Sequence, residues 1–96
     1  MKKSPEKYLS IAFARLETDH RITSWHVSLY MALFMLWTKS DYRDTFTVSR
    51  SALMKLSHIR SYMTYHKCIG QLRDFGYISY LPSYHPARGS AIVMLF

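Results

Sequence analysis

The first half of the chain contains two segments in which apolar residues recur at the spacing of an α-helix. The first helix is predicted to begin after Ser4, a residue type that caps helices, with Pro5 in its first turn. Residues 16–21 are polar and are predicted to form the loop that follows it. The apolar positions that would turn this helix toward a core are Leu9, Ala12, Phe13 and Leu16.

Residues 24–39 are predicted to form a second helix that is apolar on nearly every side. The positions on one of its faces are Trp25, Leu29, Ala32, Leu33, Leu36 and Trp37. Val27, Tyr30 and Phe34 occupy another face. Helices that are apolar all round lie in the middle of a fold, so we expect other elements to cover this one. It is shorter than the ~20 apolar residues of a membrane span, so no membrane location is expected.

Two shorter amphipathic segments follow, with a tight corner at residues 58–60 between them. Ser49 is predicted to cap the first segment. The second segment, residues 61–75, is predicted to begin at Ser61 and to end before Gly76, because glycine commonly follows the last turn of a helix. Two helices joined in this way are a helix-turn-helix, in which the second helix enters the major groove of DNA. The residues of the first segment that are expected to face inward are Leu53, Met54 and Leu56.

The second of these helices has a buried and an exposed face when successive residues are placed about 100° apart. The buried face is expected to consist of Tyr65, Cys68, Ile69 and Leu72. The opposite face would carry Met63, Lys67, Gly70 and Asp74, with His66 and Gln71 beside them. Glycine in the middle of a helix costs about 1 kcal/mol relative to alanine. We therefore expect either the DNA or a packed neighbour to lie close to Gly70.

Two β-prone segments complete the chain. Residues 77–81 and 91–96 are predicted strands, and the loop between them, 82–89, contains two prolines and a glycine. Residues 46–48 are too few for more than a stub of strand. Two strands joined by an exposed basic loop after a helix-turn-helix form a wing. The expected fold class is α+β, a winged helix-turn-helix with an extra N-terminal helix and a C-terminal β-hairpin wing. This single domain would consist of the N-terminal helix and loop, 1–21, and the winged-helix core, 22–96.

Positive charge is concentrated in the second half of the chain. Thirteen Lys and Arg residues against six Asp and Glu residues give a net charge of +7. From residue 49 onward Asp74 is the single carboxylate against six Lys and Arg residues. Such a basic surface suits a polyanion, and we predict that the partner is double-stranded DNA.

The residues predicted to contact DNA have side chains suited to phosphates or base edges. Arg and Lys bind phosphates and guanine O6 and N7, Ser and Thr hydroxyls bind phosphates, and Gln pairs with adenine. Arg88, in the predicted wing, would hold the phosphates beside the groove. The complete set is Arg50, Lys55, Arg60, Ser61, Tyr62, Thr64, His66, Lys67, Gln71 and Arg88.

These motifs resemble a known family. Residues 57–78, with Ser61-x-x-Thr64, Leu72, Gly76 and Ile78, are similar to the winged helix-turn-helix of many bacterial regulators. Together with residues 22–37, residues 48–56 and the strand Gly89-Ser90-x-Ile92, they resemble small winged-helix proteins of bacterial mobile elements and prophages. Those proteins are related to the N-terminal domains of primosome and phage replication-initiator proteins. The resemblance implies DNA binding through the second helix, at Ser61, Tyr62, Thr64, His66 and Lys67.

Sequence-specific DNA binding by a transcriptional regulator is the function we expect, and two other functions fit the same pattern. One is an accessory factor in the replication initiation of a mobile element. The other is a winged helix that binds a protein through its apolar faces. A homodimer through the N-terminal helix and the 24–39 helix is also expected, because one winged helix covers little DNA. The contacts would include Met31, Phe34 and Met35.

Catalytic and metal-binding patterns are missing from the sequence, so we expect neither an enzyme nor a cofactor. His66 and Cys68 are the closest pair of metal-ligating residues, but residues two apart on a helix point about 160° away from each other. The three glycines are too scattered for a phosphate-binding loop, and no small-molecule ligand is evident. The single cysteine excludes an internal disulfide. Together with the lack of a signal-peptide pattern, it leads us to expect a cytoplasmic protein.

Overall fold

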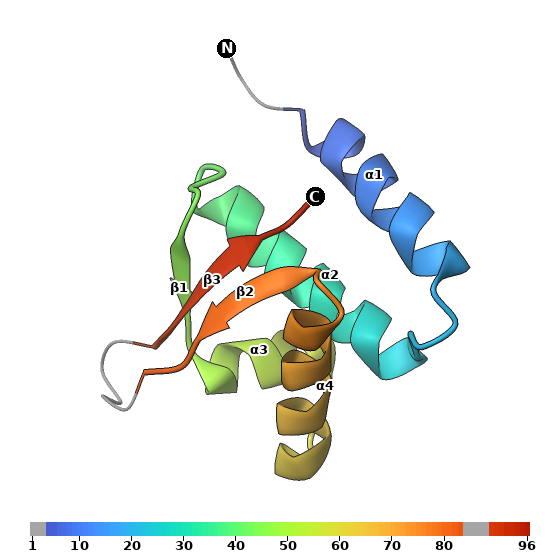
Figure 1. The fold of residues 1–96 in the computed structure, drawn as a ribbon. Helices are drawn as coiled ribbons and strands as arrows, with labels where there is room; N and C mark the ends of the chain where they lie inside the picture. The colour runs from blue at the N-terminus through green and yellow to red at the C-terminus, as the bar shows by residue number, and fades with distance from the viewer. Residues whose placement is uncertain (1–3, 84–88) are drawn as a thin grey trace.

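Four helices and three short strands are formed by residues 4–83 and 89–96, the part of the chain that this computed structural model describes (Figure 1). The result is an α+β fold, which is the class predicted. In chain order the elements are α1 Pro5–Thr18, α2 Ser24–Lys39, β1 Phe46–Val48, α3 Arg50–Ser57, α4 Tyr62–Asp74, β2 Ile78–Leu81 and β3 Ser90–Met94.

The three strands form one antiparallel sheet in the order β1-β3-β2. The last strand, β3, is therefore central, with Phe46 of β1 and Tyr80 of β2 both opposite Ile92. Sequence periodicity predicted the β2–β3 hairpin but left β1 as an isolated stub. The pairing of β1 with β3 joins segments more than 40 residues apart, and it gives the short strand a partner for its backbone groups.

The helix α2 lies behind the sheet in Figure 1 and packs against both α3 and α4. Leu29, Tyr30 and Leu33 on this helix are almost completely buried, which confirms the prediction of a central helix. The buried apolar residues form one cluster that takes side chains from α1 through to β3.

Three apolar side chains that were predicted to face the core are instead exposed. Trp25, Phe13 and Leu56 retain 50%, 42% and 36% of their accessible surface. Phe13 and Leu56 each stand about 100° around their helix from a neighbouring position, Ala12 or Ser57, that does face the core. The contact strip on α1 and α3 is therefore narrower than the apolar stripe in the sequence.

The first helix also continues through Thr18, so the prediction of a loop from Leu16 was wrong by about one turn. Leu16 is buried in the common core, which holds the last turn of α1 in place. The hydroxyl of Thr18 donates to the carbonyl oxygen of Ala14, so this polar residue extends the helix rather than ending it.

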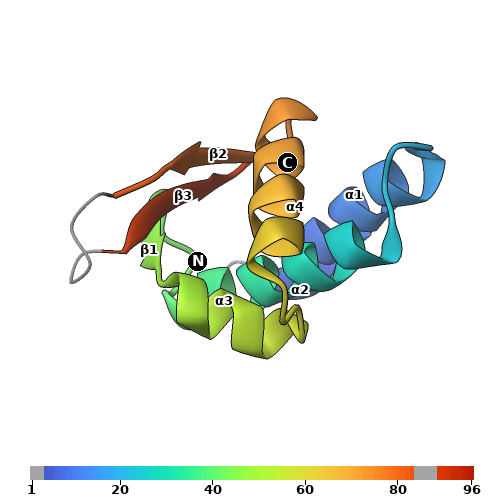
Figure 2. The same cartoon turned by 90° about the horizontal axis from the view of Figure 1, so that it is seen from below.

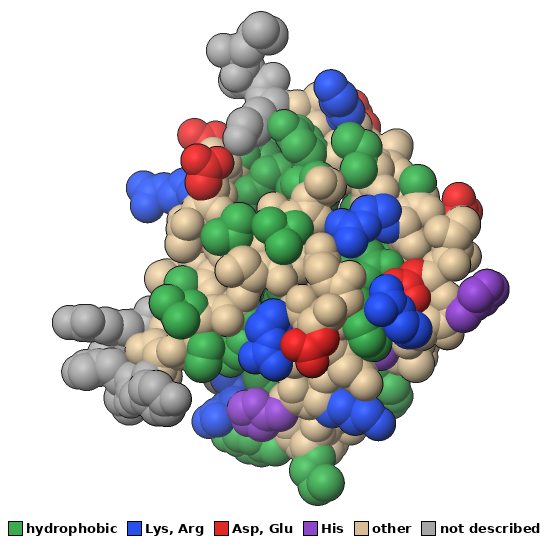
Figure 3. Space-filling view, viewed as in Figure 1, with side chains coloured by type: hydrophobic (Ala, Val, Ile, Leu, Met, Phe, Trp, Pro, Cys, Tyr) green, Lys and Arg blue, Asp and Glu red, His purple; other side chains and the backbone are tan. Residues whose placement is uncertain are grey.

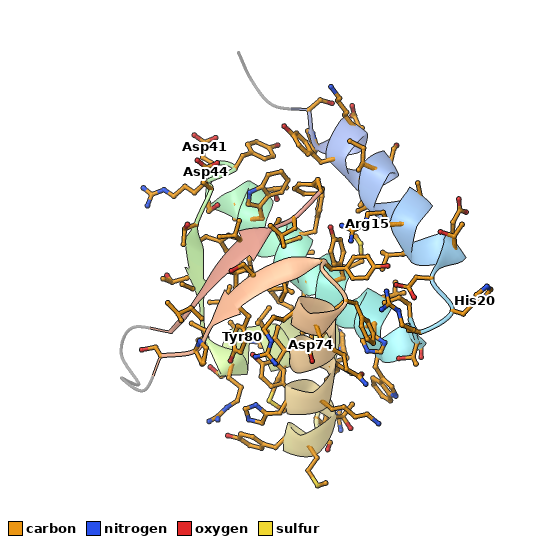
Figure 4. The ribbon with its side chains drawn as sticks, in the orientation of Figure 1. Arg15, His20, Asp41, Asp44, Asp74 and Tyr80 are labelled. Carbon is orange, nitrogen blue, oxygen red and sulfur yellow. The ribbon has the colours of Figure 1, made fainter. Side chains whose placement is uncertain are left out.

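Arg15 attaches α1 to the other end of the chain. Its guanidinium donates to the carbonyl oxygens of Leu95, at 2.7 Å, and Gly76, at 3.0 Å, and lies over the ring of Tyr77. The hydroxyl of Tyr77 donates to Asp19 at 2.9 Å, and the bonds from Arg21 hold the pKa of that carboxyl well below its usual range. These contacts fix α1 against the corner between α4 and β2, near the C-terminus (Figures 1 and 4).

None of the described helices is long and apolar enough to cross a membrane. Within residues 4–83 and 89–96, no three His, Cys, Asp or Glu side chains are placed to share a metal ion.

Candidate nucleic-acid interface

A tight turn joins α3 to α4, and the two helices run in clearly different directions (Figure 2). His58 ends α3 in the left-handed conformation, with φ of 58°. Ile59, the next residue, is buried and pins the turn to the core. The hydroxyl of Ser28 on α2 donates to the carbonyl oxygen of Ser57. The orientation of α4 is therefore set by the core and by a bond from α2.

Serine caps begin both helices, as predicted. The Oγ atom of Ser49 accepts from the backbone N–H of Ala52 at 3.1 Å, and that of Ser61 accepts from Thr64 at 3.2 Å. The hydroxyl hydrogen of each serine remains able to donate to another group. The hydroxyl hydrogen of Ser61 is therefore compatible with the phosphate contact predicted for this residue.

The inner face of α4 is the one that periodicity predicted. Tyr65, Cys68, Ile69 and Leu72 are all buried, and Phe75 lies half-buried at the edge. Burial raises the pKa of Tyr65 to about 12 and also raises the pKa of the Cys68 thiol. Both side chains are therefore neutral core residues at neutral pH.

The outer face of α4 carries exposed side chains that continue onto the start of α3. Tyr62, His66 and Lys67 are exposed, and Thr64 is half-buried. The guanidinium carbon of Arg50 lies 4.2 Å from the centre of the Tyr62 ring, which in turn stacks on His66. This Arg50–Tyr62–His66 cluster links the two helices through a cation–π contact, which holds the Arg50 charge at the surface.

An open groove of about 410 Å³ separates the start of α3 and the side of α4 from the sheet. Arg50 and His66 line it from the helices, and Tyr80 lines it from β2, where Figure 4 labels it. Four serine side chains add hydroxyl groups to its wall, those of Ser49, Ser51, Ser83 and Ser90. The groove thus has a mixed polar and apolar lining with one cation, Arg50, and it lies between the helix pair and the β2–β3 hairpin.

Negative charge is scarce on this side of the molecule. Asp74 is the one carboxylate between residues 49 and 83, and it pairs with Arg73 at 3.0 Å. Asp41 and Asp44 lie between α2 and β1, at the opposite end of the view from α4 (Figure 4). Lys, Arg and His side chains gather over the lower part of Figure 3, where α3 and α4 lie.

Several predicted contact residues are free to meet a ligand, but they do not all share one face. Arg60 and Lys67 are exposed and make no ion pair with a described residue. Lys55 is exposed on the side of α3 opposite Leu53, and this placement separates it from the groove. Arg88 lies outside the described residues, as does the rest of segment 84–88 of the predicted wing.

Gln71 has a partner inside the protein. His26 of α2 is buried, and its Nδ1 accepts from the backbone N–H of Thr23 at 2.9 Å. The ring proton therefore lies on Nε2, which donates to the Gln71 Oε1 at 2.7 Å. The amide oxygen predicted for an adenine contact is thus engaged in joining α4 to α2. The hydrogen bond between Gln71 and His26 could not be predicted from the sequence, because the two residues are 45 positions apart.

Replacing Gln71 by alanine is expected to lower the free energy of unfolding by about 1–2 kcal/mol, because the buried His26 Nε2–H loses its acceptor. Urea unfolding followed by circular dichroism would measure the change. Lys67→Ala, on the exposed face of the same helix, is the control and should alter stability by less than about 0.5 kcal/mol. Equal effects of the two substitutions would show that the His26–Gln71 bond contributes nothing.

Comparison with known proteins assigns the chain to no family: no family model, curated protein or solved structure matches it.

Proposed function

We propose that this protein is a winged helix-turn-helix that binds duplex DNA, with α4 in the major groove and the β2–β3 hairpin as the wing. The observation that carries the proposal is the outer face of α4. This face carries the exposed Lys67 and His66, its one carboxylate, Asp74, is paired with Arg73, and α4 stands on a turn anchored in the core. A major groove of about 12 Å width admits one such helix.

The first turns of α4 would make the base contacts. Tyr62, His66 and Lys67 project there, and Lys67 is able to donate to guanine. Arg60 and the Arg50 guanidinium, held on Tyr62, would neutralise phosphates on the flanking strand. The groove between the helices and the sheet would bind the sugar–phosphate backbone. Arg88, in the predicted wing, would contact further phosphates.

Sequence-specific binding of this kind suits a transcriptional regulator. Selection of bound duplexes from a random pool would define the site that is read. Recovery of a common sequence motif is expected. Mapping of that motif to promoters would support transcriptional control, whereas mapping to replication origins would favour the accessory role in replication.

A fluorescence-anisotropy titration with labelled duplex tests DNA binding itself. Neutralisation of about four phosphates predicts that the logarithm of the affinity falls with the logarithm of salt concentration with a slope of about −3 to −4. Failure to bind duplex at about 50 mM salt would reject the proposal. Binding with no dependence on salt would contradict the role given to the Arg and Lys side chains.

A homodimer through α1 and α2 belongs to the same proposal, because two copies would read two half-sites. Met35 on α2 and Phe13 on α1 are exposed apolar side chains, and Met31 is half-buried. Phe34 is buried within the chain, so the structure removes it from the predicted contact. Sedimentation equilibrium should give twice the monomer mass of 11.4 kDa, and a mass of one chain at all concentrations would reject the dimer.

A further inference from the structure

Gly70 stands in the middle of α4 at a position where the fold has no need for glycine. Its φ angle is not positive, unlike those of Gly76 and Gly89. A Cβ atom built on it would meet only the Nη2 atom of Arg73, at 3.8 Å, which is ordinary van der Waals contact. No packed neighbour in the described part of the chain therefore requires glycine here, although glycine destabilises a helix interior relative to alanine.

Gly70, which has no Cβ atom, lies on the outer face of α4. Met63, Lys67 and Gly70 follow each other at intervals of four and three residues, so they lie along one side of α4. The buried residues of α4 occupy the opposite side. Met63 is 84% exposed, and Lys67 is exposed without an ion pair to a described residue. The stripe thus leads from two projecting side chains to half-buried backbone at Gly70, where no side chain stands over the helix.

We infer that Gly70 is a binding residue, which allows the wall of the DNA major groove to lie directly against the backbone of α4. This inference rests on the proposed function and adds to it a contact made without a side chain. Glycine is the residue that permits such close approach, because it has no Cβ atom to hold the partner away.

The charges around Gly70 favour DNA as the occupant over an apolar protein surface. Lys67 lies one turn before it, and the Arg73 guanidinium lies beside it. The single nearby carboxylate, Asp74, is held by Arg73 at 3.0 Å. A sugar–phosphate strand passing over Gly70 would thus meet two cations and one carboxylate that is already paired.

Gly70→Ala tests the inference, because it should move stability and binding in opposite directions. The melting temperature should rise by about 4 °C, since alanine favours the helix and fits the available space. Affinity for the duplex selected by the wild-type protein should fall at least about 5-fold. Gly70→Leu should weaken binding further, because a longer side chain keeps the DNA farther away.

Thr45→Ala is the control, since it places alanine at an exposed position between α2 and β1, outside α4 and outside the two helices of the proposed dimer. It should leave the affinity unchanged. An undiminished affinity of Gly70→Ala, with the wild type binding DNA, would overturn the inference but leave the proposed function standing. A lower melting temperature of Gly70→Ala would overturn it too, because the fold would then require glycine. Absence of binding by the wild type would reject the proposed function first.

Discussion

Combined reversal of charge at Arg60 and Lys67 is expected to weaken DNA binding by at least about 100-fold at ~100 mM salt. Both side chains are exposed and make no ion pair with a described residue, so Arg60→Glu and Lys67→Glu leave the packing of the domain intact. Each substitution removes one cation from the interface and adds an anion that repels the phosphates. The folded structure should remain, because surface substitutions of this kind usually alter stability by less than about 0.5 kcal/mol.

A second double variant separates the effect of position from the effect of net charge. Lys7→Glu with Lys39→Glu makes the same change of charge at exposed sites on α1 and α2, away from the groove. Its affinity for duplex should fall only a few-fold, since screening limits interactions beyond about 10 Å. Because α1 and α2 also form the proposed dimer contact, sedimentation equilibrium of both double variants checks that the oligomeric state is unchanged. Equal losses in the two double variants would mean that α4 does not form the interface. Unchanged DNA binding in the Arg60/Lys67 variant would instead favour a protein-interaction module.

Replacement of Gly89 by alanine is expected to lower the free energy of unfolding by about 2–4 kcal/mol. Gly89 has a φ of +68°, which other L-residues rarely adopt. An added Cβ atom would also lie 2.6 Å from the carbonyl oxygen of Val48 and 3.1 Å from its carbonyl carbon. Val48 is opposite Ser90 in the β1–β3 pair, so the backbone cannot move away without disturbing the sheet.

Gly76→Ala provides the comparison that isolates this close contact. Its φ of +84° imposes a similar conformational strain, but the nearest atom to an added Cβ is the Arg15 Nη2 at 3.8 Å. We expect a cost of about 1–2 kcal/mol there, as is usual for strained backbone. Urea unfolding of both variants would measure the two costs. A cost at Gly89 no greater than that at Gly76 would show that β1 and β3 separate without penalty.

Periodicity and capping chemistry were sufficient for the local structure of the helices. The buried face of α4, the caps at Ser49 and Ser61 and the end of the helix at Gly76 all agree with the sequence-based prediction. Each of these features depends on residues within one or two turns of each other. Interactions over such short separations repeat in a regular pattern, so the sequence alone determines them.

The tertiary structure decided which partners lie beside each helix. Gln71 belongs by periodicity to the edge of the exposed face, yet buried His26 takes its amide oxygen. The Arg50 side chain is positioned by the ring of Tyr62 on another helix. Strand β1 is positioned by its pairing with β3, at the far end of the chain. The sequence determined that Gly70 faces outward, but the free space around it appears only once the helices and strands are packed together. Contacts between residues distant in the chain depend on how all the helices and strands pack together. Local sequence patterns do not predict this packing.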